Sequence, residues 1–278
     1  MNERAAFADL GAAASSSTDC IGVFDSGVGG LSVLRVLHQR LPDASMVYVG
    51  DVAHAPYGER SAPEILARCA LIVEHLAAAG ARIIVIACNT ATVSAIEALR
   101  ARWPTLMFVG VEPGVKPAAA RSRSRRIAVM TTAATATSDR LRHLIARHAE
   151  NVHVHVQPCP ALASAIECGV LGGPALREIL RPYCDEILAA NVDTVVLGCT
   201  HYPFVEEGIR DLLGSELDLI DTATAIAERT ASLWERIPPA FDAAPRVRVL
   251  STGALDTMQL LLARCAELDQ LKVESLAC

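Results

Sequence analysis

The sequence lacks the features that mark several large classes of protein. No apolar run reaches the roughly 18 residues of a membrane-spanning helix, because the most apolar stretch, residues 70–88, contains Glu74, His75 and Arg82. The first nineteen residues carry four charged side chains and lack the apolar segment of a signal peptide. We therefore expect no membrane partner, and we expect the protein to be cytoplasmic.

Basic residues are also few. The 278 residues include 25 Lys and Arg against 31 Asp and Glu, which gives a formal net charge of −6. A nucleic-acid-binding domain is usually strongly basic, so nucleic acid is not an expected partner. Lys116 and Lys272 are the only lysines, and neither stands out as a Schiff-base residue.

The nine cysteines lack a paired spacing. No CxxC occurs, which argues against a zinc ribbon and against a thioredoxin-like motif. His153 and His155 share one face of a predicted strand, but no third ligand accompanies them, so no metal site is expected. We interpret seven cysteines as core or surface residues: Cys20, Cys69, Cys159, Cys168, Cys184, Cys265 and Cys278.

Hydrophobic residues make up 52% of the chain, enough to bury a sizeable core. From residue 20 onward, short β-branched runs alternate with amphipathic stretches, which predicts parallel α/β layers. The predicted strands are Cys20–Phe24, Met46–Gly50, Arg82–Ala87, Leu106–Val109, Arg126–Met130, Val152–Val156, Thr194–Leu197, Asp218–Ile220 and Arg246–Leu250. Helical patterns include Gly30–Arg40, Ala62–Ala79, Ala91–Arg102, Ser138–His148 and Ala175–Ala190. Residues 1–19, rich in Ala and Ser, are expected to form a disordered tail.

Three strand motifs recur in the same order at nearly the same spacing. The pairs are Ile21–Ser26 with Ile127–Thr132, Met46–Asp51 with Val152–Gln157, and Ile83–Thr90 with Thr194–His201. Chance similarity among apolar strands is the alternative explanation. The repeat predicts two pseudo-symmetric α/β domains, the first of residues 20–113 with 224–278 and the second of residues 114–223.

Cys88 and Cys199 occupy matching places in this repeat, each at the end of an apolar strand. Ligands of open α/β sheets bind outside the carboxyl ends of the strands, so both thiols are expected to open onto one cleft. Two bases on opposite sides of one carbon are what a stereochemical inversion requires. A thiolate suits this role, because the ordinary pKa of cysteine is about 8.5. From the residues alone, two buried structural cysteines are the alternative.

Four strings carry a resemblance to a known family: IGVFDSGVGGL at 21–31, GDVAHAPYGERS at 50–61, IACNTAT at 86–92 and VVLGCTHYP at 195–203. In this order and spacing they closely resemble the glutamate racemases, with a weaker echo at Ser251, Thr252 and Gly253. The resemblance implies two parallel-sheet α/β domains with the active site in the cleft between them. It implies interconversion of L- and D-glutamate without cofactor or metal, which supplies D-glutamate for peptidoglycan and thereby serves cell-wall biogenesis and cell shape.

The resemblance also implies catalytic residues. Cys88 matches the base that acts on D-glutamate, and Cys199 matches its counterpart for L-glutamate. Asp25 matches a carboxylate that assists the first cysteine, and His201 matches the histidine that assists the second. Glu167 stands where the family has an acidic residue near that second cysteine.

The substrate-binding residues that the resemblance implies are Asp25, Ser26, Tyr57, Gly58, Asn89, Thr90, Thr200 and His201. Asn89-Thr90 and Thr200-His201 are both predicted to open helices, whose free N–H groups can bind the substrate carboxylates. Many family members have Thr and Arg where this chain has Val52 and His54, which alters the loop leading to Tyr57.

Other functions stay open at this point. A racemase of aspartate or another acidic amino acid, and a non-catalytic amino-acid-binding protein, are both compatible with the same fold. A redox role is disfavoured, because Cys88 and Cys199 lie in separate motifs without CxxC. The arginines between residues 121 and 126 are expected to form a solvated loop. A homodimer is left open.

Overall fold

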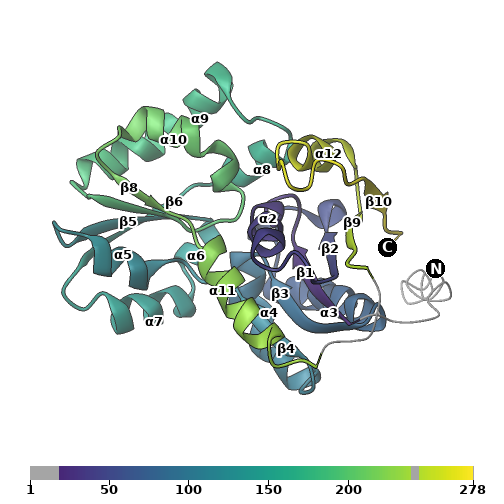
Figure 1. Ribbon diagram of the computed structural model, residues 1–278. Helices are drawn as coiled ribbons and strands as arrows, with labels where there is room; N and C mark the ends of the chain where they lie inside the picture. Colours follow the sequence, from purple (N-terminus) through teal and green to yellow (C-terminus); the bar gives the residue numbers. More distant parts are fainter. Residues whose placement is uncertain (1–18, 239–243, 278) are drawn as a thin grey trace. The chain divides into compact units, whose positions relative to one another are not determined.

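The computed structural model describes residues 19–238 and 244–277. The chain forms two compact units (Figure 1). One consists of the described residues up to Val111 and from Ala223 onward, and the other of Glu112–Thr222. Each unit has its own sheet and is described by itself.

The first unit contains a six-stranded, all-parallel sheet with the strand order β10-β9-β2-β1-β3-β4. Its strands are β1 (Cys20–Asp25), β2 (Met46–Gly50), β3 (Ala81–Ile86), β4 (Met107–Gly110), β9 (Val247–Ser251) and β10 (Val273–Ser275). The central strand β1 is buried along its whole length, as expected for a parallel sheet covered on both faces. Because the strands are parallel, their carboxyl ends meet at one edge, where Asp25, Gly50 and Ile86 end β1, β2 and β3.

Helices cover this sheet in two pairs, α2 with α11 and α3 with α4. The helical segments are α2 (Leu31–Arg40), η2 (Val52–His54), η3 (Tyr57–Glu59), α3 (Ala62–Ala78), α4 (Asn89–Arg102), α11 (Ala223–Trp234) and α12 (Asp256–Leu262). A capping box of Ser61 and Glu64 begins α3. The core that α3 and α4 share with the sheet contains Phe24, Ile84 and Leu99.

The second unit contains a four-stranded parallel sheet with the order β6-β5-β7-β8. Its segments are α5 (Val115–Arg121), β5 (Arg126–Thr131), α6 (Ala133–Ala136), α7 (Asp139–His148), β6 (His153–Pro158), α8 (Leu162–Glu167), α9 (Gly173–Ala189), β7 (Thr194–Leu197), η4 (Tyr202–Val205), α10 (Glu206–Leu213) and β8 (Asp218–Ile220). Its core includes Ile127, Val129, Leu141 and Val196.

The two sheets repeat one arrangement. The order β2-β1-β3-β4 in the first unit is the order β6-β5-β7-β8 in the second. Strands β1, β2 and β3 correspond to β5, β6 and β7, which are the pairs that the sequence repeat predicted. Two parallel-sheet α/β halves are thereby confirmed, and β9 and β10 extend the first sheet beyond β2.

The tail expected at residues 1–19 lies outside the described residues except for Asp19. That carboxylate pairs with the Arg82 guanidinium at 3.1 Å, next to the start of β3. Across the part of the chain that the structure describes, no helix combines the length and apolar character needed to cross a membrane.

Candidate active site

The first cysteine lies in a small cluster at the carboxyl edge of the six-stranded sheet. Asp25 ends β1, and Cys88 follows the neighbouring strand β3. The Sγ atom of Cys88 lies 3.6 Å from Oγ of Ser26, and Oγ of Ser26 lies 3.3 Å from Oδ1 of Asp25. The backbone N–H of Gly27 also donates to Oδ1 of Asp25, at 2.7 Å. A chain of hydrogen bonds therefore links a thiol, a hydroxyl and a buried carboxylate, an arrangement that can support proton transfer.

Cys88 is also the N-cap of α4. Its sulfur accepts a hydrogen bond from the backbone N–H of Ala91 at 3.4 Å. The positive end of a helix stabilises negative charge on such a sulfur. Asn89 and Thr90 form the first turn of α4 and are each 3% exposed, as predicted for a helix that opens at Asn89. Among the described residues, Nδ2 of Asn89 is buried without a hydrogen-bond partner, so this amide can donate to a ligand. We call Asp25, Ser26, Cys88, Asn89 and Thr90 the Cys88 cluster.

Tyr57 and Gly58 lie in η3, which contacts α4. The Tyr57 side chain is fully buried, and its hydroxyl donates to Oδ2 of Asp51 at 2.6 Å. Burial, together with the nearby Cys69, Asp51 and Cys88, raises the pKa of Tyr57 well above its usual value. The phenol is therefore a neutral donor that is already engaged by Asp51.

The second cysteine lies at the corresponding place in the four-stranded sheet, after β7. The Sγ atom of Cys199 lies 3.6 Å from Nδ1 of His201, and Nε2 of His201 lies 2.6 Å from Oε1 of Glu167. Glu167 ends α8, and α8 packs against η4. Thiol, imidazole and carboxylate form a chain in which the histidine can exchange a proton with the cysteine. We call Glu167, Cys199, Thr200 and His201 the Cys199 cluster.

His201 is 3% exposed, and its charge state depends on competing effects. Burial by itself lowers the pKa of an imidazole, but the neighbouring Cys199 sulfur and the Glu167 carboxylate outweigh it and raise the pKa of His201 well above 6.5. The histidine is therefore charged at neutral pH when Cys199 is a thiolate. A charged imidazole beside the sulfur stabilises that thiolate.

Thr200-His201 opens a helix as predicted, but this helix begins as a 3-10 turn, whereas the one at Asn89-Thr90 is an α-helix from its start. Thr200 lies in a turn, and His201 caps the short 3-10 helix η4, which leads directly into α10. Pro203 lies in the first turn of η4, where its missing N–H costs no hydrogen bond. A 3-10 turn is common at the N-terminus of an α-helix, and its first N–H groups also lack partners within the helix.

Three further residues, Asp51, Arg68 and Thr252, were not predicted from the sequence. Asp51 follows β2 and is fully buried, and its carboxylate accepts hydrogen bonds from Arg68 and from Thr252. Asp51 belongs to the GDVAHAPYG string, and Thr252 belongs to the weaker family resemblance at residues 251–253. The sequence therefore contains a partial indication of a functional role for both residues. Arg68 lies within α3 and carried none.

The other described cysteines are mostly buried. Burial raises the pKa of Cys20 to about 11 and that of Cys184 to about 12, and it also raises those of Cys69, Cys159 and Cys265. These thiols stay neutral at physiological pH, as core residues do. Cys168 is exposed, and Cys278 lies outside the described residues.

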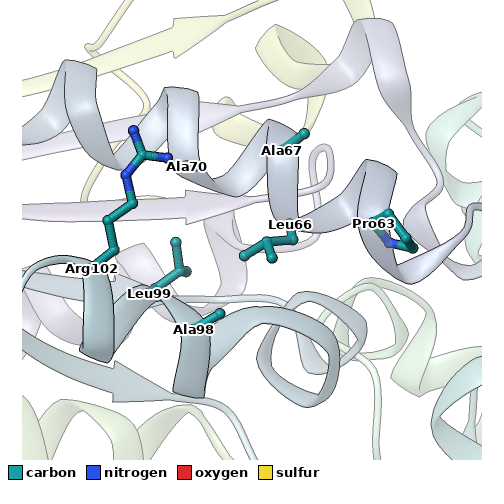
Figure 2. A pocket seen from close by; sticks show the side chains of 7 residues that line it. All are labelled: Pro63, Leu66, Ala67, Ala70, Ala98, Leu99 and Arg102. Atoms are coloured by element: carbon teal, nitrogen blue, oxygen red, sulfur yellow. The ribbon is translucent and has the colours of Figure 1, made fainter.

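A groove of about 330 Å³ lies between α3 and α4, away from the Cys88 end of α4 (Figure 2). Its walls are formed by Pro63, Leu66, Ala67, Ala70, Ala98, Leu99 and Arg102. Arg102 is the one charged side chain in this lining, and it also stacks on the Trp103 ring at 4.4 Å. The lining has no carboxylate, thiol or imidazole, so the groove has no proton-transfer chemistry.

Comparison with known proteins shows the family to which the chain belongs. The model of the Asp/Glu/Hydantoin racemase family matches residues 21–230, which include every residue of both clusters. The chain belongs to the Asp/Glu/Hydantoin racemase family. It is therefore an enzyme of the racemase class.

Members of this family include close relatives of the chain. It is 48% identical over 243 residues to a glutamate racemase of Ectopseudomonas mendocina, covering 87% of this chain and 92% of that protein. It is similar to the Escherichia coli glutamate racemase solved with L-glutamate and the activator UDP-MurNAc-ala, at a TM-score of 0.82 and 32% identity, covering 94% of this chain and 98% of the other. The Francisella tularensis glutamate racemase solved with D-glutamate gives a TM-score of 0.79 at 26% identity, covering 94% and 99%.

Proposed function

We propose that this racemase interconverts L- and D-glutamate by cofactor-independent proton transfer at Cα. The observation that carries the proposal is the equivalent placement of two thiols. Cys88 and Cys199 follow corresponding strands of the repeated sheet, and each is hydrogen-bonded to a polar group, Ser26 in one case and His201 in the other. Relatives named as glutamate racemases, one solved with L-glutamate and one with D-glutamate, support the same substrate.

In the proposed reaction, the Cys88 thiolate removes the proton from Cα of D-glutamate. The Cys199 thiol then delivers its own proton to the opposite face and becomes a thiolate, which yields L-glutamate. The reverse direction starts from the Cys199 thiolate. One proton is taken and one is given in each turnover, so the enzyme ends with its protonation pattern exchanged between the two sulfurs.

The neighbouring groups prepare each sulfur for its task. Asp25 and Ser26 form a hydrogen-bonded chain to Cys88, and the N–H of Ala91 stabilises its negative charge. His201, which is hydrogen-bonded to Glu167, stabilises negative charge on Cys199 in the same way. Because Cα–H is a very weak acid, the groups that bind the substrate must contribute much of the acceleration by positioning it.

Substrate binding in this proposal falls to the polar groups at the two strand ends. Ser26, Asn89 and Thr90 serve the Cys88 side, with Tyr57 and Gly58 in η3, and Thr200 and His201 serve the Cys199 side. Asn89 supports this assignment best, because its buried amide has an unused donor. The cellular role that we propose is supply of D-glutamate for peptidoglycan in the cytoplasm.

The first experiment is circular dichroism of the purified protein with D-glutamate and then L-glutamate, without added cofactor. Decay of both signals toward zero supports glutamate racemisation. Decay with aspartate alone replaces glutamate by aspartate as the substrate. No decay with either favours the amino-acid-binding protein.

Variants of the two thiols test the mechanism. Cys88→Ser and Cys199→Ser should each reduce racemisation by about 10³-fold, within the usual range for loss of a general acid or base. The exposed Cys168 lies outside both clusters, so Cys168→Ser is the matched control and should keep wild-type activity. Normal turnover in either of the first two variants contradicts the two-base mechanism.

A further inference from the structure

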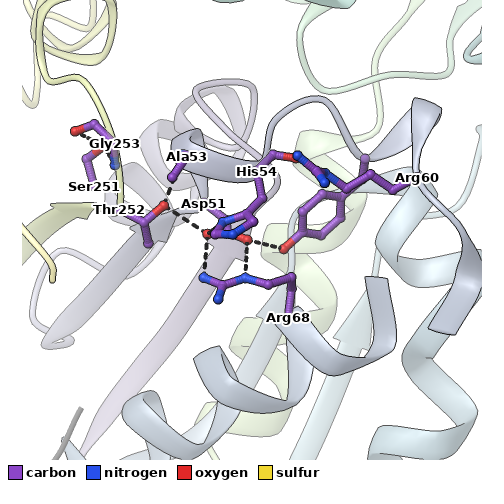
Figure 3. A network of polar contacts seen from close by, with 9 residues as sticks. Asp51, Ala53, His54, Arg60, Arg68, Ser251, Thr252 and Gly253 are labelled. Carbon is purple, nitrogen blue, oxygen red and sulfur yellow. Dashed lines mark hydrogen bonds and ion pairs between the residues drawn. The ribbon is translucent and has the colours of Figure 1, made fainter. Parts of the chain in front are cut away.

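One buried carboxylate ties together four segments of the first unit (Figure 3). Oδ1 of Asp51 accepts from Nη2 of Arg68 at 2.9 Å and from Oγ1 of Thr252 at 2.8 Å, and it lies 3.1 Å from Nδ1 of His54. Oδ2 accepts from Nε of Arg68 at 3.0 Å and from the Tyr57 hydroxyl at 2.6 Å. Two-point binding by Arg68 fixes the plane of the carboxylate as well as its charge.

The partners of Asp51 come from separate parts of the chain. His54 and Tyr57 belong to the segment 52–59, which contains η2 and η3. Arg68 belongs to α3, and Thr252 follows β9 in the segment that returns from the C-terminal part. The network therefore anchors 52–59 to the helix that follows it and to a segment that lies about 200 residues further along the chain.

Backbone contacts strengthen the same connection. The N–H of Thr252 donates to the Gly50 carbonyl at 3.1 Å, and the Thr252 hydroxyl oxygen accepts from the N–H of Ala53 at 3.2 Å. Gly253 packs so closely that a Cβ there would lie 2.7 Å from the Ala53 nitrogen. Thr252 thus contacts both Asp51 and the start of the segment that Asp51 holds.

The anchored segment adjoins the Cys88 cluster. The N–H of Asp51 donates to the carbonyl of Asp25 at 3.0 Å. Tyr57 belongs to η3, which contacts α4, the helix that begins directly after Cys88. With its hydroxyl on Asp51 and its ring fully buried, Tyr57 fixes the segment in place.

We propose that Asp51, Arg68 and Thr252 are positioning residues that hold Tyr57 and Gly58 in place beside the Cys88 cluster. The proposal rests on the proposed function, because it takes Tyr57 and Gly58 to bind glutamate. Binding would then depend on a threonine that lies outside residues 21–230, the range matched by the family model. Loss of an anchoring hydrogen bond weakens substrate binding, while both thiols keep their own neighbours.

The test compares Thr252→Val with Thr252→Ser. Valine has a similar shape but no hydroxyl, so KM for both D- and L-glutamate should rise by about 3- to 10-fold, the equivalent of one net hydrogen bond. The value of kcat should change less than KM. Serine keeps the hydroxyl and should restore KM to near the wild-type value.

Thr230→Val is the matched control. Thr230 is also buried in the first unit, but its hydroxyl donates within α11 to the Ile226 carbonyl at 2.8 Å. This variant should leave KM unchanged. Hydrogen exchange of the backbone amides gives a readout independent of activity: Thr252→Val should speed exchange in 52–59, and Thr230→Val should not.

The outcomes separate this proposal from the proposed function. An active wild type whose KM does not respond to Thr252→Val overturns the positioning role alone, even if exchange in 52–59 becomes faster. A rise in KM that Thr252→Ser fails to reverse, or that Thr230→Val reproduces, overturns it as well. A folded wild type that does not racemise glutamate overturns the proposed function, and the positioning role with it.

Discussion

Nε2 of His201 lies 2.6 Å from Oε1 of Glu167, while Nδ1 of the same ring lies 3.6 Å from the Cys199 sulfur. The ring thus joins a carboxylate from the end of α8 to a thiol from the end of β7. Its charge is stabilised from both sides, which is why the pKa of His201 is raised despite complete burial. This relationship leads to a prediction about titration.

Replacing Glu167 with Gln should lower the pKa of His201 toward 6.5, because the amide carries no charge to stabilise the imidazolium. The measurement is NMR titration of isotope-labelled histidine, with the His201 signal assigned by its loss in His201→Asn. An unchanged pKa in Glu167→Gln contradicts the role that we give to this carboxylate.

Deuterium labelling should show that the proton on the product comes from the second thiol. In D₂O, L-glutamate formed from D-glutamate should carry deuterium at Cα from the first turnover, because the thiol proton exchanges with solvent before substrate binds. Mass spectrometry of the two enantiomers after partial conversion measures this. Product that retains the original hydrogen contradicts transfer between two bases and favours a single base that returns the same proton.

Asp51→Asn should destabilise the first unit by about 3–5 kcal/mol at neutral pH, because the buried Arg68 guanidinium would lose the carboxylate charge that binds it at two points. The Arg68 side chain is 10% exposed, so solvent offers little compensation. Urea unfolding of the variant and the wild type measures the difference. A loss of less than about 1 kcal/mol would mean that solvent or another group replaces the carboxylate.

The same carboxylate predicts a pH dependence. Burial alone raises the pKa of Asp51, but hydrogen bonds from Arg68 and Tyr57 outweigh it and hold the pKa below 3.8. A lowered folded-state pKa contributes stability that is complete above the unfolded value and is lost as the pH falls through the folded value. Below pH 3.8 the wild type should therefore lose stability more steeply than Asp51→Asn. If the stability of the wild type and that of Asp51→Asn fall equally steeply with pH, the lowered pKa of Asp51 is contradicted.

Gly30→Ala should reduce both stability and activity. A Cβ at Gly30 would lie 2.7 Å from Cβ of Asp25 and 2.9 Å from Cε2 of Tyr48, so Asp25 at the end of β1 or the start of α2 would have to move. Overpacking of this kind costs about 1–3 kcal/mol. Gly172→Ala is the control, since φ there is 178° and a Cβ would meet nothing within 4 Å. Urea midpoints and racemisation rates that agree between the two variants would contradict the prediction.

The sequence predicted most strands of both sheets, because the apolar pattern of a strand is local. Met46–Gly50, Thr194–Leu197 and Asp218–Ile220 begin and end where expected. Strand β10 (Val273–Ser275) was missed because only one of its three residues is apolar, whereas the equally short β8 has two. The helix predicted at Thr200-His201 begins as a 3-10 turn, because a residue pattern does not distinguish an α-helix from a 3-10 turn that leads into one.

By itself, the sequence determined the repeated α/β pattern and the motifs that hold Cys88 and Cys199, because apolar periodicity and short strings are properties of neighbouring residues. The tertiary structure decided which side chains surround them. Glu167 meets His201 across 34 residues, and Thr252 meets Asp51 across 201. Such pairs depend on how parallel strands bring distant loops to one edge of a sheet, and no local pattern specifies them. The partners of Asp51 could therefore be found only once the chain was folded.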